Sequence, residues 1–251
     1  MSPNLAQPSC WIGTSGWYYA HWRERFYPQT LCQSRWLEFY AQHFPTVELN
    51  VTFYRLPQAS VWQRWRETTP VNFRFAVKAN RSITHFKRLG EVQQPLANFL
   101  EQVRLLGDKL GPILYQLPPY LQRDEDLLEC FLPQLPPDCQ NVIEFRHRSW
   151  YFESVYELLR HYGVAFCVHD RRGCATPVVT TTGFTYLRLH GSSGDYGDCY
   201  SDSELGMWIQ RIRDLSQTLQ SAYAYFNNDR EGFAVVNAQT FSQMWQRAAI
   251  V

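Results

Sequence analysis

Short, mostly hydrophobic stretches alternate with longer amphipathic stretches along most of the chain. In the short stretches apolar residues recur at every second position, the spacing of a β-strand, and in the longer ones they recur every three or four positions, as on one face of a helix. Strands are predicted over residues 10–17, 46–54, 73–81, 111–118, 141–150, 164–170, 184–191 and 222–229.

Amphipathic helices are predicted between most of these strands. The helix predicted over 201–219 begins with Ser201 or Asp202 as its cap, whereas residues 171–183 contain no convincing helix. Strands that alternate with helices indicate a parallel sheet. The other clear helices cover residues 34–44, 95–111 and 124–135.

Eight such units in a chain of 251 residues match the size of a TIM-barrel-like (β/α)8 parallel barrel. We therefore predict an α/β fold with a single domain over residues 1–251, in which residues 1–9 form an N-terminal tail. A doubly wound open sheet is the alternative. It is disfavoured because the first predicted turn, in GTSGWYY, lacks the G-x-G-x-x-G spacing of a dinucleotide-binding fold.

The stretch VIEFRHRSW, residues 142–150, carries more charge than a buried strand usually does. Side chains alternate between the two faces of a strand, so if Ile143 and Phe145 face the helices, Glu144 and Arg146 face the barrel interior. The same phasing of the other strands places further polar residues inside, mostly toward the C-terminal ends. The inward set contains Glu48, Lys78, Gln116, Glu144, Arg146, Arg188, His190 and Asn227.

This inward polar set has two interpretations, because isolated buried charges are costly and must be compensated. The charged members could neutralise one another in a structural ion-pair network. Alternatively they bind a ligand, which we favour because the positive groups outnumber the negative ones and lie at the end where barrel enzymes carry their chemistry. On strand 164–170 the phase leaves open whether His169 or Asp170 points inward.

The overall composition restricts the class of protein. The formal net charge is +1, so no overall field attracts the chain to nucleic acid or membranes. The N-terminus MSPNLAQPSC lacks the apolar segment of a signal peptide, and no apolar run is long enough to span a membrane. The seven cysteines include no C-x-x-C pair, which favours a reducing compartment. We predict a cytoplasmic protein without a membrane partner.

Three predicted loops have compositions that suit a ligand. Residues 13–28 are rich in aromatic residues that could stack on a sugar or base, residues 78–90 are basic, and residues 190–201 are rich in Gly and Ser, as in phosphate-binding loops. An ordinary packed or solvated loop also explains each composition. The chain has no H-E-x-x-H or similar spacing of metal ligands, so no metal is predicted, and the cofactor is left open.

Eight motifs occur in a fixed order along the chain: IGTSGWYYAHW, FYP, VELNVTFYRLP, FRFAVKANRSITH, LLGDKLGPILYQLPP, EFRHRSW, YLRLHG and YFNND. Together they closely resemble the YecE-like family of uncharacterised proteins, also known as domain of unknown function 72. The resemblance implies a TIM-barrel-like fold and assigns no reaction. Val51 is a departure, because the family more often has serine there. The positions that the resemblance marks are Gly13, Ser15, Trp17, Asn50, Lys78, His85, Gln116, Glu144, Arg146, Arg188, His190, Asn227 and Asn228.

We therefore predict an enzyme that acts on a small anionic molecule, phosphorylated or carboxylated, at the C-terminal end of the barrel. Lys78, Arg146 and Arg188 would hold the anion. Glu144 would be the general acid or base with His190 as its partner. Lys78 is also a catalytic candidate, because a lysine with a lowered pKa can form a Schiff base. The other predicted substrate-binding residues are Glu48, Asn50, Gln116, Asn227, His85 and Trp17.

Several alternatives stay open. Hydrolysis, elimination and isomerisation all fit these residues, and the oligomeric state is undetermined. The protein could instead be a nucleic-acid-binding or nucleic-acid-processing barrel resembling endonuclease-type barrels, or a binding module without chemistry. Glu144 is expected to be buried but ionised at pH 7 without a ligand, because nearby cations should outweigh the effect of burial on its pKa.

Overall fold

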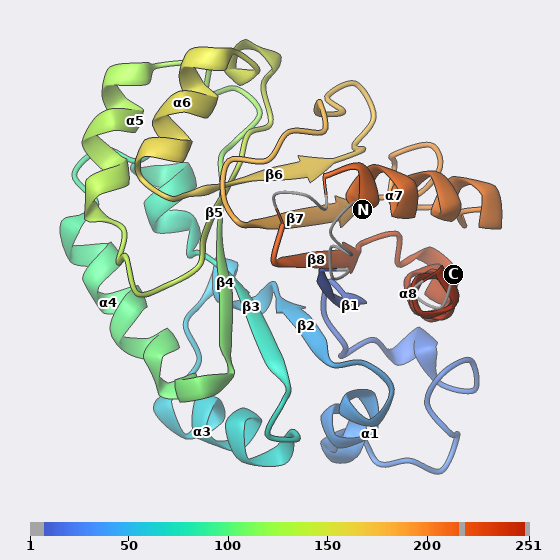
Figure 1. Ribbon diagram of the computed structural model, residues 1–251. Helices are drawn as coiled ribbons and strands as arrows, with labels where there is room; N and C mark the ends of the chain where they lie inside the picture. Colours follow the sequence, from blue (N-terminus) through green and yellow to red (C-terminus); the bar gives the residue numbers. More distant parts are fainter. Residues whose placement is uncertain (1–7, 216–218, 249–251) are drawn as a thin grey trace, which may run out of the picture.

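Parallel strands form an eight-stranded, nearly closed barrel in the computed structural model, which describes residues 8–215 and 219–248 (Figure 1). Each strand pairs with its neighbours in the order β1-β8-β7-β6-β5-β4-β3-β2. The predicted TIM-barrel-like fold is confirmed. The strands are β1 (Ser9–Thr14), β2 (Thr46–Leu49), β3 (Arg74–Lys78), β4 (Leu110–Gln116), β5 (Asn141–Glu144), β6 (Ala165–His169), β7 (Phe184–Leu189) and β8 (Ser221–Phe226).

Helices surround the barrel on its outside (Figure 1). Ser201 caps α7 (Asp202–Asp214): its hydroxyl accepts a hydrogen bond from the Glu204 amide, and the Glu204 carboxylate accepts one from the Ser201 amide. As predicted, no helix lies between β6 and β7. The helices are α1 (Trp36–His43), α2 (Val51–Tyr54), α3 (Ala59–Thr68), α4 (Gln93–Val103), α5 (Glu125–Phe131), α6 (Glu153–His161), α7 (Asp202–Asp214) and α8 (Phe233–Ala248).

Every predicted strand runs past its observed C-terminal end, and two of them do so by five residues or more. The strand predicted over 46–54 ends at Leu49, because the chain turns into α2 at Val51. Strand alternation, which turns Leu49 outward, would also turn Val51 outward under a helix, but Val51 is exposed. The strand predicted over 141–150 ends at Glu144. Of the predicted N-terminal tail, residues 1–7 lie outside the described residues, and Ser9 already begins β1.

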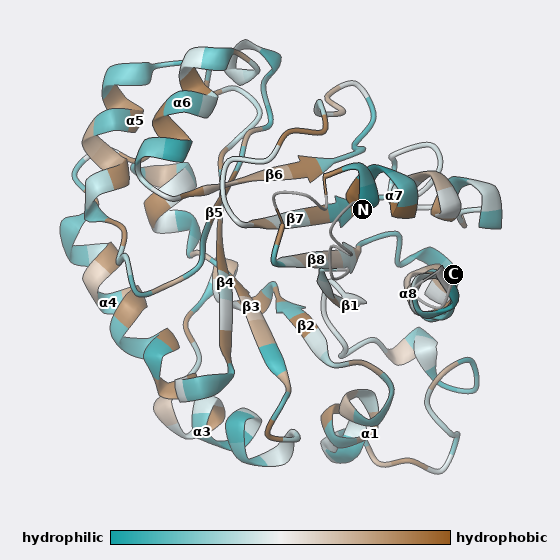
Figure 2. Cartoon of the chain, in the orientation of Figure 1, coloured by the Kyte–Doolittle hydropathy of each residue, from teal (hydrophilic) through white to brown (hydrophobic). Residues whose placement is uncertain are grey.

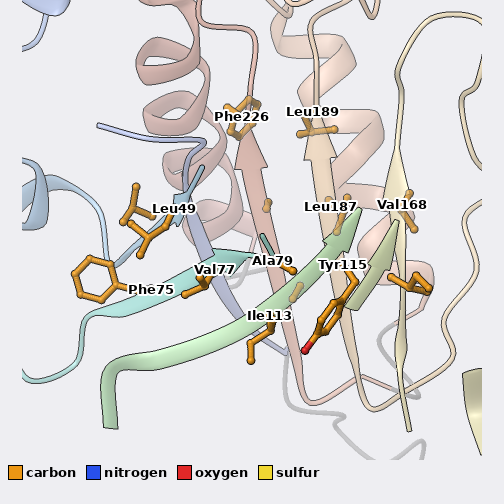
Figure 3. Close-up of a cluster of buried hydrophobic side chains, with 14 of the residues drawn as sticks. Leu49, Phe75, Val77, Ala79, Ile113, Tyr115, Val168, Leu187, Leu189 and Phe226 are labelled. Carbon is orange, nitrogen blue, oxygen red and sulfur yellow. The ribbon is translucent and has the colours of Figure 1, made fainter. Parts of the chain in front are cut away.

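The two faces of the strands form two separate hydrophobic clusters, as the period-two pattern predicts. Outward side chains such as Val77, Ile113 and Leu187 pack beneath the helices (Figure 3), and the strands are correspondingly apolar (Figure 2). Inward side chains fill the barrel nearer its N-terminal end. This interior cluster contains Ala76, Leu114, Val142, Ala165, Cys167, Phe184, Tyr186, Tyr223 and Tyr225.

Between β1 and β2 the barrel is not closed by a continuous ladder of backbone hydrogen bonds. Instead, a tyrosine hydroxyl bridges the two strands, and a glycine allows them to approach each other. The Tyr40 hydroxyl, from α1, accepts a hydrogen bond from the Thr14 amide and donates one to the Thr46 carbonyl, both at 3.0 Å. A Cβ added to Gly13 would lie 2.1 Å from the same carbonyl oxygen, so only glycine allows this approach. The closure brings Ser15 beside Glu48, with which it forms an isolated bridge.

None of the helices within residues 8–215 and 219–248 has the length and apolar character needed to cross a membrane.

Candidate active site

Arg188 of β7 lies between two glutamates at the C-terminal end of the barrel interior. Its Nη2 and Nε donate to Glu48 of β2 at 2.8 and 2.9 Å, and its Nη1 donates to Glu144 of β5 at 2.9 Å. All three side chains are buried, with at most 2% of their surface exposed. The predicted convergence of inward charges from separate strands is therefore confirmed for these residues.

Glu48 is held by three donor residues, two on β7 and one just beyond β1. Besides Arg188, its carboxylate accepts hydrogen bonds of 2.7 Å from the Ser15 hydroxyl, beyond β1, and from the Tyr186 hydroxyl of β7. Burial acts to raise the pKa of Glu48, but Arg188 and these hydrogen bonds outweigh it and lower the pKa below its ordinary value. Glu48 is therefore ionised at neutral pH and fixed in position, and its partner is Arg188 within the protein.

Glu144 is also fully engaged. Its carboxylate accepts hydrogen bonds from Gln116 Nε2 at 2.9 Å and from Arg146 Nε, in addition to Arg188. Burial acts to raise its pKa, but Arg146 and Arg188 hold the pKa well below the ordinary range. The expectation that Glu144 stays ionised is confirmed. A carboxylate this strongly stabilised accepts a proton only after its surroundings change.

Lys78, at the end of β3, is the basic residue of this site that the network does not engage. Its Nζ lies over the face of the Phe53 ring, 4.1 Å from the centroid. Among the described residues no carboxylate lies within 4.0 Å of Nζ, and the side chain forms no hydrogen bond. Burial, followed by the charge of Arg188, lowers the pKa of Lys78 to about 7. A substantial fraction of this amine is therefore neutral at physiological pH.

The short helix α2 places Phe53 against Lys78. The Thr52 hydroxyl bonds the carbonyls of Leu49 and Lys78 at 3.0 and 2.7 Å, and Asn80 Nδ2 donates to the Thr52 carbonyl at 2.9 Å. These bonds fix the turn between β2 and α2 onto the end of β3. The strand pattern could not reveal this contact, because residues 51–54 read as a continuation of β2.

His190, beyond β7, belongs to a second polar group next to the network. Its Nδ1 lies 3.2 Å from Asp170 Oδ1, and the Tyr200 hydroxyl donates to the other oxygen of Asp170. The carboxylate can only accept, so Nδ1 carries the proton and Nε2 is left with a lone pair. Nε2 is buried without a hydrogen-bond partner. Burial lowers the pKa of His190 to about 4, so its imidazole is neutral at pH 7.

Tyr196 connects the two groups. Its hydroxyl accepts a hydrogen bond from Arg146 Nη1 at 3.1 Å, and its ring packs edge-on against His190 at 4.9 Å between centroids. Tyr196 comes from the Gly/Ser-rich loop that the sequence singled out, but nothing in the pattern marked the tyrosine itself. On β6, His169 is the inward residue: its ring lies 5.9 Å from that of His190.

The structure does not bring every predicted residue into this network. Trp17 packs edge-on against Trp65 of α3, with 5.4 Å between centroids, and so forms part of the outer core. His85 contacts the Phe53 ring at 4.8 Å, on the Lys78 side of the site. Asn50 precedes α2, with its Oδ1 buried and unpartnered. Asn227, after β8, is partly exposed.

The sequence reasoning missed Asp170 as a partner of His190, and it missed Tyr200 altogether. Asp170 was considered for an inward orientation, but it reaches His190 from the loop after β6. As for metals, no group of three or more His, Cys, Asp or Glu side chains in residues 8–215 and 219–248 is arranged to hold an ion. The absence of a metal stays a prediction.

Replacing Glu48 by Gln should lower the free energy of unfolding by about 3–5 kcal/mol, because it leaves Arg188 buried without half of its compensating charge. Urea denaturation measures this. Asp138→Asn is the matched control, since Asp138 pairs with Arg104 on the surface, 2.8 Å away, and its loss should change stability little. If both variants unfold at the same urea concentration as the parent, the network does not stabilise the barrel.

Comparison with known proteins places this architecture in a family. Residues 11–250 match the family described as protein of unknown function DUF72. The chain is 26% identical over 268 residues to the UPF0759 protein YunF of Bacillus subtilis, which covers 93% of this chain and 94% of the relative. It is 35% identical over 122 residues to the UPF0759 protein YecE of Escherichia coli, covering 48% of this chain and 45% of the relative.

Solved structures agree with this family assignment. A DUF72 family protein from Thermotoga maritima superposes with a TM-score of 0.85 at 31% identity, covering 95% of this chain and 99% of that one. A DUF72 family protein from Enterococcus faecalis, at 19% identity and a TM-score of 0.82, shares the fold. The chain, which is similar in sequence to YunF and YecE and in structure to a solved DUF72 protein, therefore belongs to the DUF72 family.

Proposed function

We propose that the C-terminal end of the barrel is the active site of an enzyme that acts on a small molecule with an anionic group. The observation that carries this proposal is Lys78. Glu48 and Glu144 are balanced by Arg188 and Arg146, so the charge of a protonated Lys78 has no counterpart within the network. A phosphate or carboxylate of a ligand would supply that counterpart.

Arg146 is the second residue suited to contact the anion. Its side chain is 8% exposed, and its guanidinium donates a hydrogen bond to the hydroxyl of Tyr196, which is an exposed residue. If a ligand oxygen replaces the Tyr196 hydroxyl as the acceptor, the ion pair of Arg146 with Glu144 stays intact. Arg188, which the sequence also suggested for the anion, is occupied by both glutamates, and its role here is to position them.

His190 is the proposed proton acceptor. Asp170 fixes the orientation of its ring, and the neutral imidazole presents an unused Nε2 lone pair. Glu144 starts as an ionised group, and an anion that neutralises Arg146 and Lys78 would raise its pKa toward the range of a useful acid or base. Gln116, Asn50 and Asn227 would contact hydroxyl or carbonyl groups of the substrate.

A second candidate function is nucleic-acid binding, which one surface feature favours. Arg81, in the basic stretch 78–90, lies over Tyr54 and Phe86 at 5.7 and 5.2 Å, and both rings are largely exposed. Aromatic rings beside a cation suit stacking on bases. We rank this function second because the formal net charge is +1 and the other site cations are buried in ion pairs.

Replacing Lys78 by Met should stabilise the protein. An amine whose pKa falls from 10.5 to about 7 on folding binds fewer protons in the folded state, so stability decreases as pH falls from about 10 to 7. Removing it should raise the free energy of unfolding at pH 7 by about 1–4 kcal/mol. Urea denaturation at several pH values should show a gain that shrinks above neutrality.

The matched control for this variant is Lys109→Met. Nζ of Lys109 donates to the carbonyls of Arg66 and Thr69 and to the Thr69 hydroxyl. The same substitution should there destabilise by about 1–3 kcal/mol, because buried acceptors lose their donor. A destabilised Lys78→Met would show that Lys78 has a structural role and would remove the main support for the proposed site.

Sulfate should stabilise the protein more at about pH 6 than at about pH 8, because a bound anion favours the protonated form of Lys78 while sulfate itself does not titrate there. Thermal unfolding with sulfate, against chloride at equal ionic strength, measures this. Lys78→Met should lose the pH dependence. Equal stabilisation of parent and variant at both pH values would place the anion elsewhere.

Duplex and single-stranded DNA should bind only weakly, with an affinity that falls steeply as salt increases. An electrophoretic mobility shift at physiological salt tests this, with Arg81→Gln as the variant that removes the cation between the two exposed rings. Tight, specific binding that this variant abolishes would reverse the ranking of the two functions.

A further inference from the structure

We infer that Lys78 forms a Schiff base with an aldehyde or ketone group of the anionic substrate. The inference rests on the proposed function and narrows it: it names the reacting group of the substrate and the protein atom that bonds to it. It also selects among the reaction classes that the site residues by themselves leave open.

The chain uses lysine rarely, and its three lysines have different surroundings. Of 24 basic residues only Lys78, Lys87 and Lys109 are lysines. Lys87 lies at the surface, 3.8 Å from Glu91. Lys109 donates to two backbone carbonyls and a hydroxyl. Lys78 has neither kind of partner, since an aromatic face takes that place.

The surroundings of Lys78 suit a nucleophilic amine. A hydrogen-bonded or ion-paired ammonium keeps its proton. An aromatic face stabilises the ammonium less than such partners do, so burial and a nearby guanidinium can lower the pKa of the amine and free its lone pair. Lys78 is a partly exposed residue at the C-terminal end of β3, and we expect a small molecule to approach Nζ from that end. Burial and Arg188 lower its pKa to about 7, which leaves much of the amine neutral.

The covalent step is balanced by the loss of one water. The Nζ lone pair attacks the carbonyl carbon, and the nitrogen loses a proton as the oxygen gains one, giving a carbinolamine. The C–O bond then breaks as the hydroxyl takes up a proton from solvent and leaves as water. The nitrogen lone pair forms the C=N bond, and because the nitrogen keeps its hydrogen the imine is protonated. Nothing is oxidised or reduced. The protonated imine keeps the positive charge over the Phe53 ring and within the field of Glu144 and Glu48.

A protonated imine draws electrons from the carbon next to it, so a C–H or C–C bond at that carbon becomes easier to break. The proton released from such a C–H bond needs an acceptor, and neutral His190 presents an unused Nε2. Arg146 remains available for the anionic group. This chemistry corresponds to a lyase or an isomerase that acts on a carbonyl compound, and hydrolysis does not require it.

Reductive trapping tests the inference on the full-length protein. Glyoxylate, a small aldehyde that carries a carboxylate, is added together with sodium borohydride, and peptide mass spectrometry locates the reduced adduct. At neutral pH Lys78 should be modified about 10-fold faster than Lys87, or more, although Lys87 is more exposed, because the lowered pKa of Lys78 leaves much of the Lys78 amine neutral. The rate at Lys78 should rise with pH through a midpoint near 7.

Two variants and one second probe sharpen the assignment. Lys87→Met should leave the labelling of Lys78 unchanged, and Lys78→Met should reduce total labelling to the level of the surface amines. Acetaldehyde, which has no carboxylate, should label Lys78 more slowly than glyoxylate does. Equal rates for the two aldehydes would overturn the anionic substrate class.

Measuring stability and labelling in the presence of sulfate distinguishes a failure of the Schiff-base inference from a failure of the proposed function. If sulfate stabilises the parent protein in a Lys78-dependent way and also slows its labelling by glyoxylate, both stand. If sulfate stabilises in this way but Lys78 is labelled no faster than Lys87, the Schiff base is overturned and the anion site stands. If sulfate has no such effect and Lys78 is not labelled selectively, both are overturned.

Discussion

The pairing of Arg188 with Glu48 and Glu144 is the interaction on which the C-terminal end of the barrel depends. It joins β7 to β2 and β5 across the interior, where most barrels have layers of branched apolar residues. Each of the three charges would be costly if it were buried alone. Their mutual contacts, with Ser15, Tyr186 and Gln116 as further donors, make a charged interior compatible with folding.

This network also explains the unusual state of Lys78. Both glutamates already face guanidinium groups, and an arginine side chain in a protein does not release its proton at physiological pH. Lys78 therefore experiences burial and two fixed positive charges, whereas the glutamates that could support its own charge are largely neutralised. The stable ion pairs and the lowered pKa of Lys78 are two consequences of one arrangement, because the network takes up the negative charge that would otherwise keep this pKa high.

Much of the fold follows from the hydrophobic pattern, because the pattern has the same period as the structure that it forms. Ile143 and Phe145 pack outward and Glu144 points inward, as alternation on a strand requires. The pattern fails where a turn interrupts the period. Thr52 and Phe53 continue the alternation of β2 in sequence, yet they form a helical turn that is held by hydrogen bonds to backbone carbonyls. A one-dimensional pattern contains no information about such bonds.

The site was predictable only as far as it lies on strands. Glu48, Glu144 and Arg188 could be placed together because strand phase fixes their direction, whereas Asp170, Tyr196 and Tyr200 come from loops whose paths the sequence does not specify. The hydrophobic pattern also could not predict that the glutamates would pair with the arginines and leave Lys78 unpaired, since ion pairing depends on distances of a few ångströms. The rigid strands thus carry the charges that must stay fixed, and the loops add the groups around them. Lys78 lies at the boundary between the two, with its backbone bonded to the Thr52 turn and its amine against Phe53. The strand and the turn fix the backbone of this partly exposed residue, and such positioning is what the proposed covalent role of Lys78 requires.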